Sequence, residues 1–84
     1  MLEKYKELLK MLSKKYNVSS FTTLETEYNA IVEKIGNKNY IDLYLENNGI
    51  EVTLYNNETE EPLEVKKYKS LKYAYNFIIK NLED

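Results

Sequence analysis

Carboxylates, lysines and tyrosines are the side chains through which this chain could do chemistry. His and Cys are both absent, so the common catalytic triads, dyads and thiolate metal sites cannot be built. Asp42, Glu46 and Glu51 could offer oxygen ligands to a hard cation, but their spacing is not that of a calcium-binding loop. Gly36 and Gly49 both fall in expected turns, which leaves no glycine-rich loop to hold a phosphate. These residue types favour a non-enzymatic protein with no cofactor and no bound metal.

Charge divides the sequence into three blocks. Residues 1–24 and residues 65–84 each carry a net charge of +3, whereas residues 25–64 contain ten carboxylates and two lysines. The overall net charge of −2 therefore conceals an acidic centre between two basic flanks. Every cationic side chain is a lysine, so no guanidinium group is available for bidentate recognition of phosphate. The abundance of Asn, Lys, Tyr and Ile is typical of an AT-rich genome.

The length of 84 residues corresponds to one compact domain that spans residues 1–84. No apolar stretch is long enough to cross a bilayer. The first six residues alternate charged and apolar side chains, which is unlike a signal peptide. We therefore expect a cytoplasmic protein without a membrane-spanning segment, and the absence of Cys agrees with a reducing compartment.

Two segments have the three-four spacing of apolar residues that predicts amphipathic helices. The first covers residues 2–16. The second covers residues 71–82, and Ser70 is a candidate N-cap for it. The stretch from Asn17 to Ser20 is rich in turn-forming residues and is interpreted as a break. Both apolar stripes are interpreted as faces that pack on a sheet.

The centre of the sequence predicts a β-hairpin. Residues 41–46 and 50–55 alternate apolar and polar side chains, and Asn48-Gly49 is the preferred dipeptide of a type I′ turn. With Asn48 and Gly49 as the two loop residues, the register follows. The expected cross-strand pairs are Leu45–Val52 and Leu43–Leu54 on the core side, and Glu46–Glu51, Tyr44–Thr53 and Asp42–Tyr55 on the other side.

The remaining strands are less sharply defined by the sequence. A strand is expected over residues 27–35, with either Ala30 and Val32 or Ile31 and Ile35 facing inward. Residues 56–62 form an acidic turn, and residues 63–68 are a candidate edge strand, because lysines on an edge discourage aggregation. The predicted fold class is α+β, a small antiparallel three- or four-stranded meander with an N-terminal and a C-terminal helix packed on one face, in the order α-β-β-β-(β)-α.

The exposed face of this sheet is the first candidate site. Aromatic and acidic side chains together suit a protein partner with a basic surface. The alternative is an ordinary solvated face of an antiparallel sheet. The candidate partner-binding residues are Tyr40, Asp42, Tyr44, Glu46, Glu51 and Tyr55, and Thr53 and Glu33 are expected on the same face.

The lysines around the start of the last helix are the second candidate site. Lys66, Lys67, Lys69 and Lys72 could contact a phosphate backbone together with the helix N-terminus. Here the order of elements resembles that of the double-stranded RNA-binding domain, in which a lysine cluster opens the second helix. That resemblance implies binding to nucleic acid, but the loop of residues 36–39 lacks the His-containing pattern of the family. The acidic centre would also repel phosphate.

Two further interpretations remain open. In its small size, single domain and AT-rich composition, the chain is similar to accessory and inhibitor proteins of phages and mobile elements, including anti-CRISPR proteins. That resemblance implies a surface whose carboxylates take the place of phosphates on a nucleic-acid-processing protein. A homo-oligomeric structural subunit that pairs through an exposed sheet edge is the other possibility. The sequence does not specify the partner or the oligomeric state.

Overall fold

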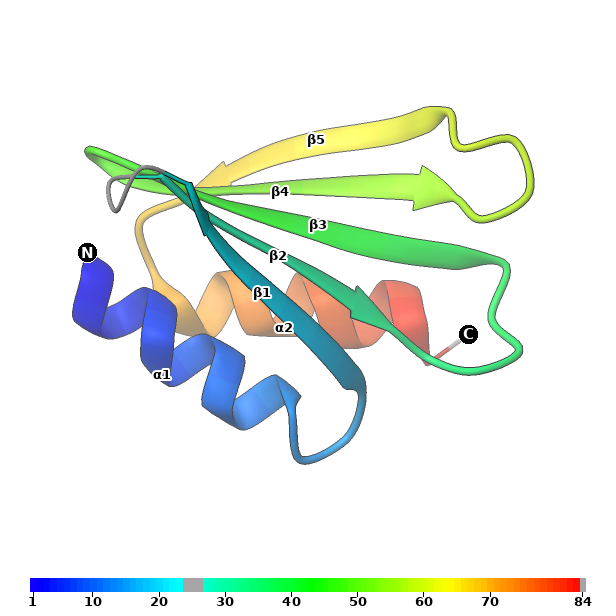
Figure 1. Cartoon of the computed structure of the whole chain (residues 1–84), viewed down its shortest axis with the longest axis horizontal. Helices are drawn as coiled ribbons and strands as arrows, with labels where there is room; N and C mark the ends of the chain where they lie inside the picture. The colour runs from blue at the N-terminus through cyan, green and yellow to red at the C-terminus, as the bar shows by residue number, and fades with distance from the viewer. Residues whose placement is uncertain (24–26, 84) are drawn as a thin grey trace.

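The computed structural model describes residues 1–23 and 27–83 as two helices and a single sheet. The five strands follow one another in an antiparallel meander, and both helices lie against one face of the sheet (Figure 1). The α+β class with both helices on one face is therefore confirmed. The elements are α1 (Leu2–Leu12), β1 (Asn17–Thr23), β2 (Glu27–Glu33), β3 (Asn39–Glu46), β4 (Gly49–Asn56), β5 (Pro62–Tyr68) and α2 (Leu71–Leu82).

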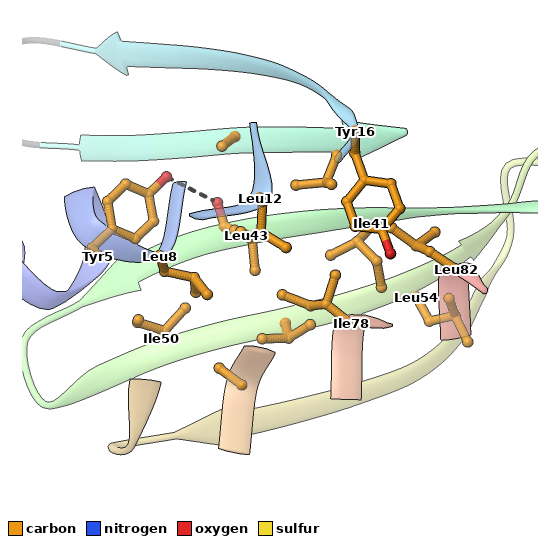
Figure 2. Close-up of a cluster of buried hydrophobic side chains, with 14 residues drawn as sticks. Tyr5, Leu8, Leu12, Tyr16, Ile41, Leu43, Ile50, Leu54, Ile78 and Leu82 are labelled. Carbon is orange, nitrogen blue, oxygen red and sulfur yellow. Dashed lines mark hydrogen bonds between the residues drawn. The ribbon is translucent and has the colours of Figure 1, made fainter. Parts of the chain in front are cut away.

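The core lies between the helices and the inner face of the sheet (Figure 2). The three-four spacing places Tyr5, Leu8 and Leu12 on one side of α1, and all three are buried. The Tyr5 hydroxyl reaches into this apolar layer and donates to the Leu43 carbonyl oxygen at 3.4 Å, and burial raises the pKa of this phenol. The core is completed by Tyr16, Ala30, Val32, Ile41, Leu43, Ile50, Val52, Leu54, Ala74, Ile78 and Leu82.

Helix α1 ends at Leu12, four residues before the expected limit at residue 16. The Ser13 hydroxyl donates to the Lys10 carbonyl oxygen at 2.9 Å, and the chain then turns back on itself. The amide nitrogens of Lys15 and Tyr16 both donate to the Leu12 carbonyl oxygen, at 3.0 and 2.9 Å. This turn keeps Tyr16 in the core, at 7% exposure, although it lies outside the helix.

Strand β1 is the main departure from the sequence-based interpretation. The stretch Asn17–Ser20, expected to be a break, is the first half of a strand that pairs antiparallel with β2. Its serines favour turns in isolation, but Val18 lies opposite Val32 and packs on the core. Pairing with β2 and this apolar contact override the local preference. The sheet therefore has five strands instead of three or four.

The structure shows which side chains of β2 face the core. Ala30 and Val32 are fully buried, whereas Ile31 points to the other face. The strand ends at Glu33, and Ile35 beyond it is 88% exposed. Two residues of the expected range 27–35 therefore belong to the turn that follows.

The β3–β4 hairpin turns one residue earlier than expected, so its register differs by two residues. Asn47 and Asn48 form the loop, and Glu46 lies opposite Gly49. A shift of two preserves the faces, because side chains alternate with a period of two. Leu43 and Leu54 therefore lie on the same face, as predicted, but they are not partners. The observed core pairs are Leu45–Ile50, Leu43–Val52 and Ile41–Leu54.

The loop is also not the expected type I′ turn, which needs a positive φ at both central residues. Among the described residues, positive φ occurs at Gly36 and at Glu60. Gly49 serves a different purpose, since a Cβ at this position would lie 2.8 Å from the Tyr68 carbonyl oxygen. The glycine allows the end of β5 to approach the start of β4.

The last part of the chain follows the sequence-based interpretation. Residues 57–61 form the turn after β4, and the Asn56 side-chain oxygen accepts from the amide nitrogens of Glu58 and Thr59 at 2.9 and 3.0 Å. Strand β5 is the second edge of the sheet. Ser70 caps α2, because its hydroxyl accepts from the Tyr73 amide nitrogen at 3.4 Å.

Candidate protein-binding face of the sheet

No helix or strand of the described residues covers the face of the sheet opposite α1 and α2 (Figure 1). We call it the outer face. The strand registers align its residues in three rows that run from β1 to β5. These rows are Phe21–Asn29–Tyr44–Glu51–Lys67, Ser19–Ile31–Asp42–Thr53–Val65 and Asn17–Glu33–Tyr40–Tyr55–Pro62. All six candidate residues of the sequence analysis share this side, with Glu46 at the end of β3.

Two of the predicted tyrosines form a stacked pair in the third row. Tyr40 and Tyr55 lie opposite each other on β3 and β4, with ring centroids 5.1 Å apart and planes 11° from parallel. Partial burial raises the pKa of Tyr40 first, and the negative charges of Glu60, Asp42 and Glu33 raise it further. The stacked rings are therefore set among carboxylates, which is an arrangement that favours cations.

Asp42 lies at the centre of the outer face and is held in place by Asn29. The Asn29 side-chain nitrogen donates to the Asp42 carboxylate and, at 2.9 Å, to the Leu43 carbonyl oxygen. Thr53, beside Asp42 in the same row, is only 8% exposed. These contacts hold the carboxylate in one position, which lowers the entropic cost of binding a partner. Asn29 is not among the residues predicted for this face, because the sequence left open which side chains of β2 point inward.

Glu46 and Glu51 do not face each other, contrary to the expected register. Glu51 lies between Tyr44 on β3 and Lys67 on β5, and Glu46 lies opposite Gly49. The Lys67 Nζ atom is 3.5 Å from Glu46 Oε1 and 3.9 Å from Glu51 Oε2. Glu46 Oε1 is buried and makes no hydrogen bond within the described part of the chain. Its contact with Lys67 is therefore an ion pair without hydrogen-bond geometry.

The outer face also carries apolar side chains that the sequence analysis did not assign to it. Phe21 of β1 and Val65 of β5 are 50% and 53% exposed, and Ile31 lies partly buried between them on β2. Phe21 is in the row of Tyr44, and Val65 is in the row of Asp42. Phe21 was missed because β1 was not predicted. The acidic centre is thus flanked by apolar groups at both edges.

The four lysines of the second candidate site do not form one patch. Lys66 and Lys67 are neighbours on β5, so their side chains point to opposite faces of the sheet. Lys66 pairs with Glu64 at 3.4 Å, and Lys67 pairs with the two carboxylates described above. Lys69 follows the strand, and Lys72 lies in α2. The double-stranded RNA-binding domain has three strands, so the five-stranded sheet also departs from that resemblance.

A depression of about 430 Å³ lies where the β3–β4 turn meets the end of β5. Its lining includes Glu46, Lys67 and Lys69, and the first two already neutralise each other. Within residues 1–23 and 27–83, no group of three or more His, Cys, Asp or Glu side chains could hold a metal ion. The depression therefore presents the Glu46–Lys67 ion pair beside Lys69.

Comparison of the chain with protein-family models, with curated proteins and with solved structures finds no match. In the part of the chain that the structure describes, neither helix has the length and apolar character needed to cross a membrane.

Proposed function

We propose that the protein is a small, non-enzymatic binding module whose outer face docks on a basic surface of another protein. The observation that carries this proposal is the uncovered sheet face, on which the stacked pair Tyr40–Tyr55 lies among carboxylates. Tyrosine is enriched at protein interfaces because it combines a large contact area with a polar tip. Carboxylates around it select a cationic partner.

The distribution of charge over the molecule supports this orientation. Asp42, Glu33 and Glu51 lie on the outer face, where Lys67 is the cation in the aligned rows. The exposed lysines of α1, such as Lys6 and Lys10, lie on the helical side. A molecule with one acidic and one basic side is steered so that its acidic side meets a basic partner first.

The chemistry of the outer face fits arginine and lysine side chains of the partner. Their cationic groups can stack on tyrosine rings and form charge-assisted hydrogen bonds with Asp42 or Glu33. Surfaces with many such side chains are typical of proteins that hold nucleic acid. We therefore propose that the partner is a nucleic-acid-processing protein and that the module acts as an inhibitor, with its carboxylates in the place of phosphates.

A titration with a synthetic arginine-rich peptide tests the chemistry of recognition. Asp42→Asn removes one negative charge from the outer face and keeps an oxygen that can accept from Asn29, so we expect Kd to rise severalfold. Tyr44→Ala should raise Kd about tenfold or more, since aromatic anchors dominate interfaces. The matched control is Glu7→Gln, which removes the same charge from an exposed position of α1. If Asp42→Asn and Glu7→Gln raise Kd equally, the binding depends only on the net charge of the protein, and the proposal is contradicted.

A capture experiment with cell lysate separates this proposal from nucleic-acid binding. A protein partner should be retained by the wild-type chain after nuclease treatment and lost from the Tyr44→Ala variant. In a direct titration with duplex RNA or DNA at low salt, we expect weak binding or none. Tight, salt-sensitive binding to nucleic acid that disappears when Lys66, Lys67 and Lys72 are replaced would favour the lysine site instead.

A further inference from the structure

The two edges of the sheet differ in how they are protected against pairing with another strand. An edge strand exposes unpaired backbone N–H and C=O groups, and proteins usually block such edges with proline, lysine or a bulge. Strand β5 has all three, with Pro62, Lys66 and Lys67 in the strand and a register shift opposite Leu54 and Tyr55. Its edge is therefore poorly suited to accept a further strand.

Strand β1 has none of these features. Its seven residues, Asn-Val-Ser-Ser-Phe-Thr-Thr, include no charged residue, no proline and no glycine. The strand lies at the end of the strand order. Ser19, Ser20, Phe21 and Thr22 are all exposed. Two charged neighbours on β2, Glu27 and Glu33, are paired with the ends of the strand and leave its middle neutral. Among residues 1–23 and 27–83, no strand pairs with the outer edge of β1, so this edge is a template for strand pairing.

We propose that β1 pairs antiparallel with β1 of a second copy of this chain across a two-fold axis. A neutral strand can pair with itself without placing like charges opposite each other. With the axis at Ser20, the midpoint of the strand, Val18 of one copy lies opposite Thr22 of the other on the helix side. Ser19 lies opposite Phe21 on the outer face, where the phenylalanine gains cover.

The difference between the two edges also explains why the assembly would stop at two copies. Head-to-tail pairing of β1 with β5 would generate an open-ended filament, but Pro62 and the lysines of β5 oppose it. Pairing of β1 with β1 uses up the one unprotected edge in each copy. The result is a dimer with a continuous sheet of twice the five strands of one copy. Both outer faces then lie on the same side of this sheet.

Sedimentation equilibrium of the whole chain tests the proposal. The chain mass is 10.0 kDa, and we expect the apparent mass to double as the concentration rises. The variants Ser20→Lys and Ser20→Glu should each weaken dimerisation at least about tenfold, since like charges then meet at the axis. An equimolar mixture of the two variants should restore the dimer, because opposite charges now face each other across the same axis.

The control is Val65→Lys, which adds the same charge to an exposed position of the other edge strand. It should leave dimerisation unchanged, and circular dichroism should show all three variants folded. The proposal is overturned if the apparent mass stays at 10.0 kDa at chain concentrations up to about 1 mM. A dimer that has not formed at this concentration has only a weakly favourable free energy of association. Loss of the dimer in Val65→Lys, or failure of the mixed variants to restore it, also overturns the proposal. The sedimentation experiment contains no partner protein, so its result does not depend on whether the proposed function is correct.

Discussion

A single exposed residue, Glu83, connects three segments that are far apart in the sequence. Its Oε2 atom accepts from the Tyr16 hydroxyl at 2.9 Å and from Lys34 Nζ at 3.2 Å, and Lys15 Nζ lies 4.0 Å from Oε1. The hydrogen bond from Tyr16 is the main cause that lowers the pKa of Glu83, followed by that from Lys34. Burial and the same contact with Glu83 raise the pKa of Tyr16.

We predict that Glu83→Gln lowers the melting temperature at pH 7. Because the pKa of Glu83 in the folded state lies below the ordinary value of 4.5, the carboxylate contributes stability above about pH 4.5. This contribution is lost as the pH falls further and the folded protein takes up the proton. Thermal melts of the wild type and the variant should therefore differ at pH 7 and converge as the pH falls below the lowered pKa of Glu83. Glu58→Gln, a matched change in the exposed turn after β4, should leave the melting temperature at pH 7 unchanged.

The structure gives Glu46 and Glu51 a shared counter-charge, Lys67. The expected register placed these two carboxylates opposite each other, as a like-charge pair that costs stability. In the structure, Lys67 lies within 3.9 Å of both carboxylates. All three side chains remain partly exposed, so each ion pair contributes no more than about 1 kcal/mol.

We predict that Lys67→Gln destabilises the protein more than Glu51→Gln does. Removing the lysine leaves two neighbouring carboxylates without a counter-charge and should lower the free energy of unfolding by about 0.5–1 kcal/mol. Removing Glu51 leaves the closer pair of Glu46 and Lys67 intact, so the change should stay within about 0.5 kcal/mol. Urea denaturation of both variants measures the two values. A larger cost for Glu51→Gln would show that its carboxylate has a structural role beyond this ion pair.

At the scale of the elements, the two glycines perform different tasks in two turns. Gly36, after β2, has a φ of 84° and open space around a hypothetical Cβ. Gly49, at the start of β4, lacks that φ requirement but lies against the backbone of Tyr68. One glycine is required by its dihedral angle, the other by the proximity of β5.

These roles predict different responses to substitution. Gly36→Ala should cost about 1–2 kcal/mol through its left-handed backbone, and Gly36→Asn should cost less, since Asn tolerates that conformation. Gly49→Ala should cost about 1–3 kcal/mol, because a Cβ at 2.8 Å from the Tyr68 oxygen forces backbone to move. Gly49→Asn should be no milder than Gly49→Ala. Denaturant melts of the four variants test this pattern, and relief by Asn at both positions would contradict it.

At the scale of the whole molecule, stability depends on a single apolar layer between the sheet and two short helices. A chain of 84 residues buries only a modest fraction of its surface, so its total free energy of unfolding lies towards the lower end of about 5–15 kcal/mol. Loss of one large core side chain should therefore affect the folding of the entire chain.

We predict that Leu43→Ala lowers the free energy of unfolding by about 2–5 kcal/mol, since Leu43 is fully buried at the centre of the sheet. The matched control is Ile35→Ala, at a position that is 88% exposed, and its effect should stay within about 0.5 kcal/mol. Thermal unfolding followed by circular dichroism checks both values. A similar decrease in the free energy of unfolding of both variants would contradict the exposed position of Ile35.

The sequence by itself determined which side chains share a face. Alternation along β3 and β4 separates Leu43 and Leu54 from Asp42 and Tyr44, and a register error of two residues leaves this separation intact. The helical stripes, the Ser70 cap and the grouping of the six candidate residues on one side were predictable for the same reason. Each depends on a period or a local hydrogen bond that neighbouring residues encode.

Only the tertiary structure decided which strands and side chains are neighbours. β1 forms because β2 and the core accept Val18, although its serines favour a turn. The pairing of β5 with β4 places Lys67 opposite Glu51 and within reach of Glu46. The pairing of β2 with β3 places Asn29 on the outer face, beside Asp42. These outcomes depend on contacts between residues far apart in the chain, whose free energies outweigh local preferences of a fraction of a kcal/mol per residue.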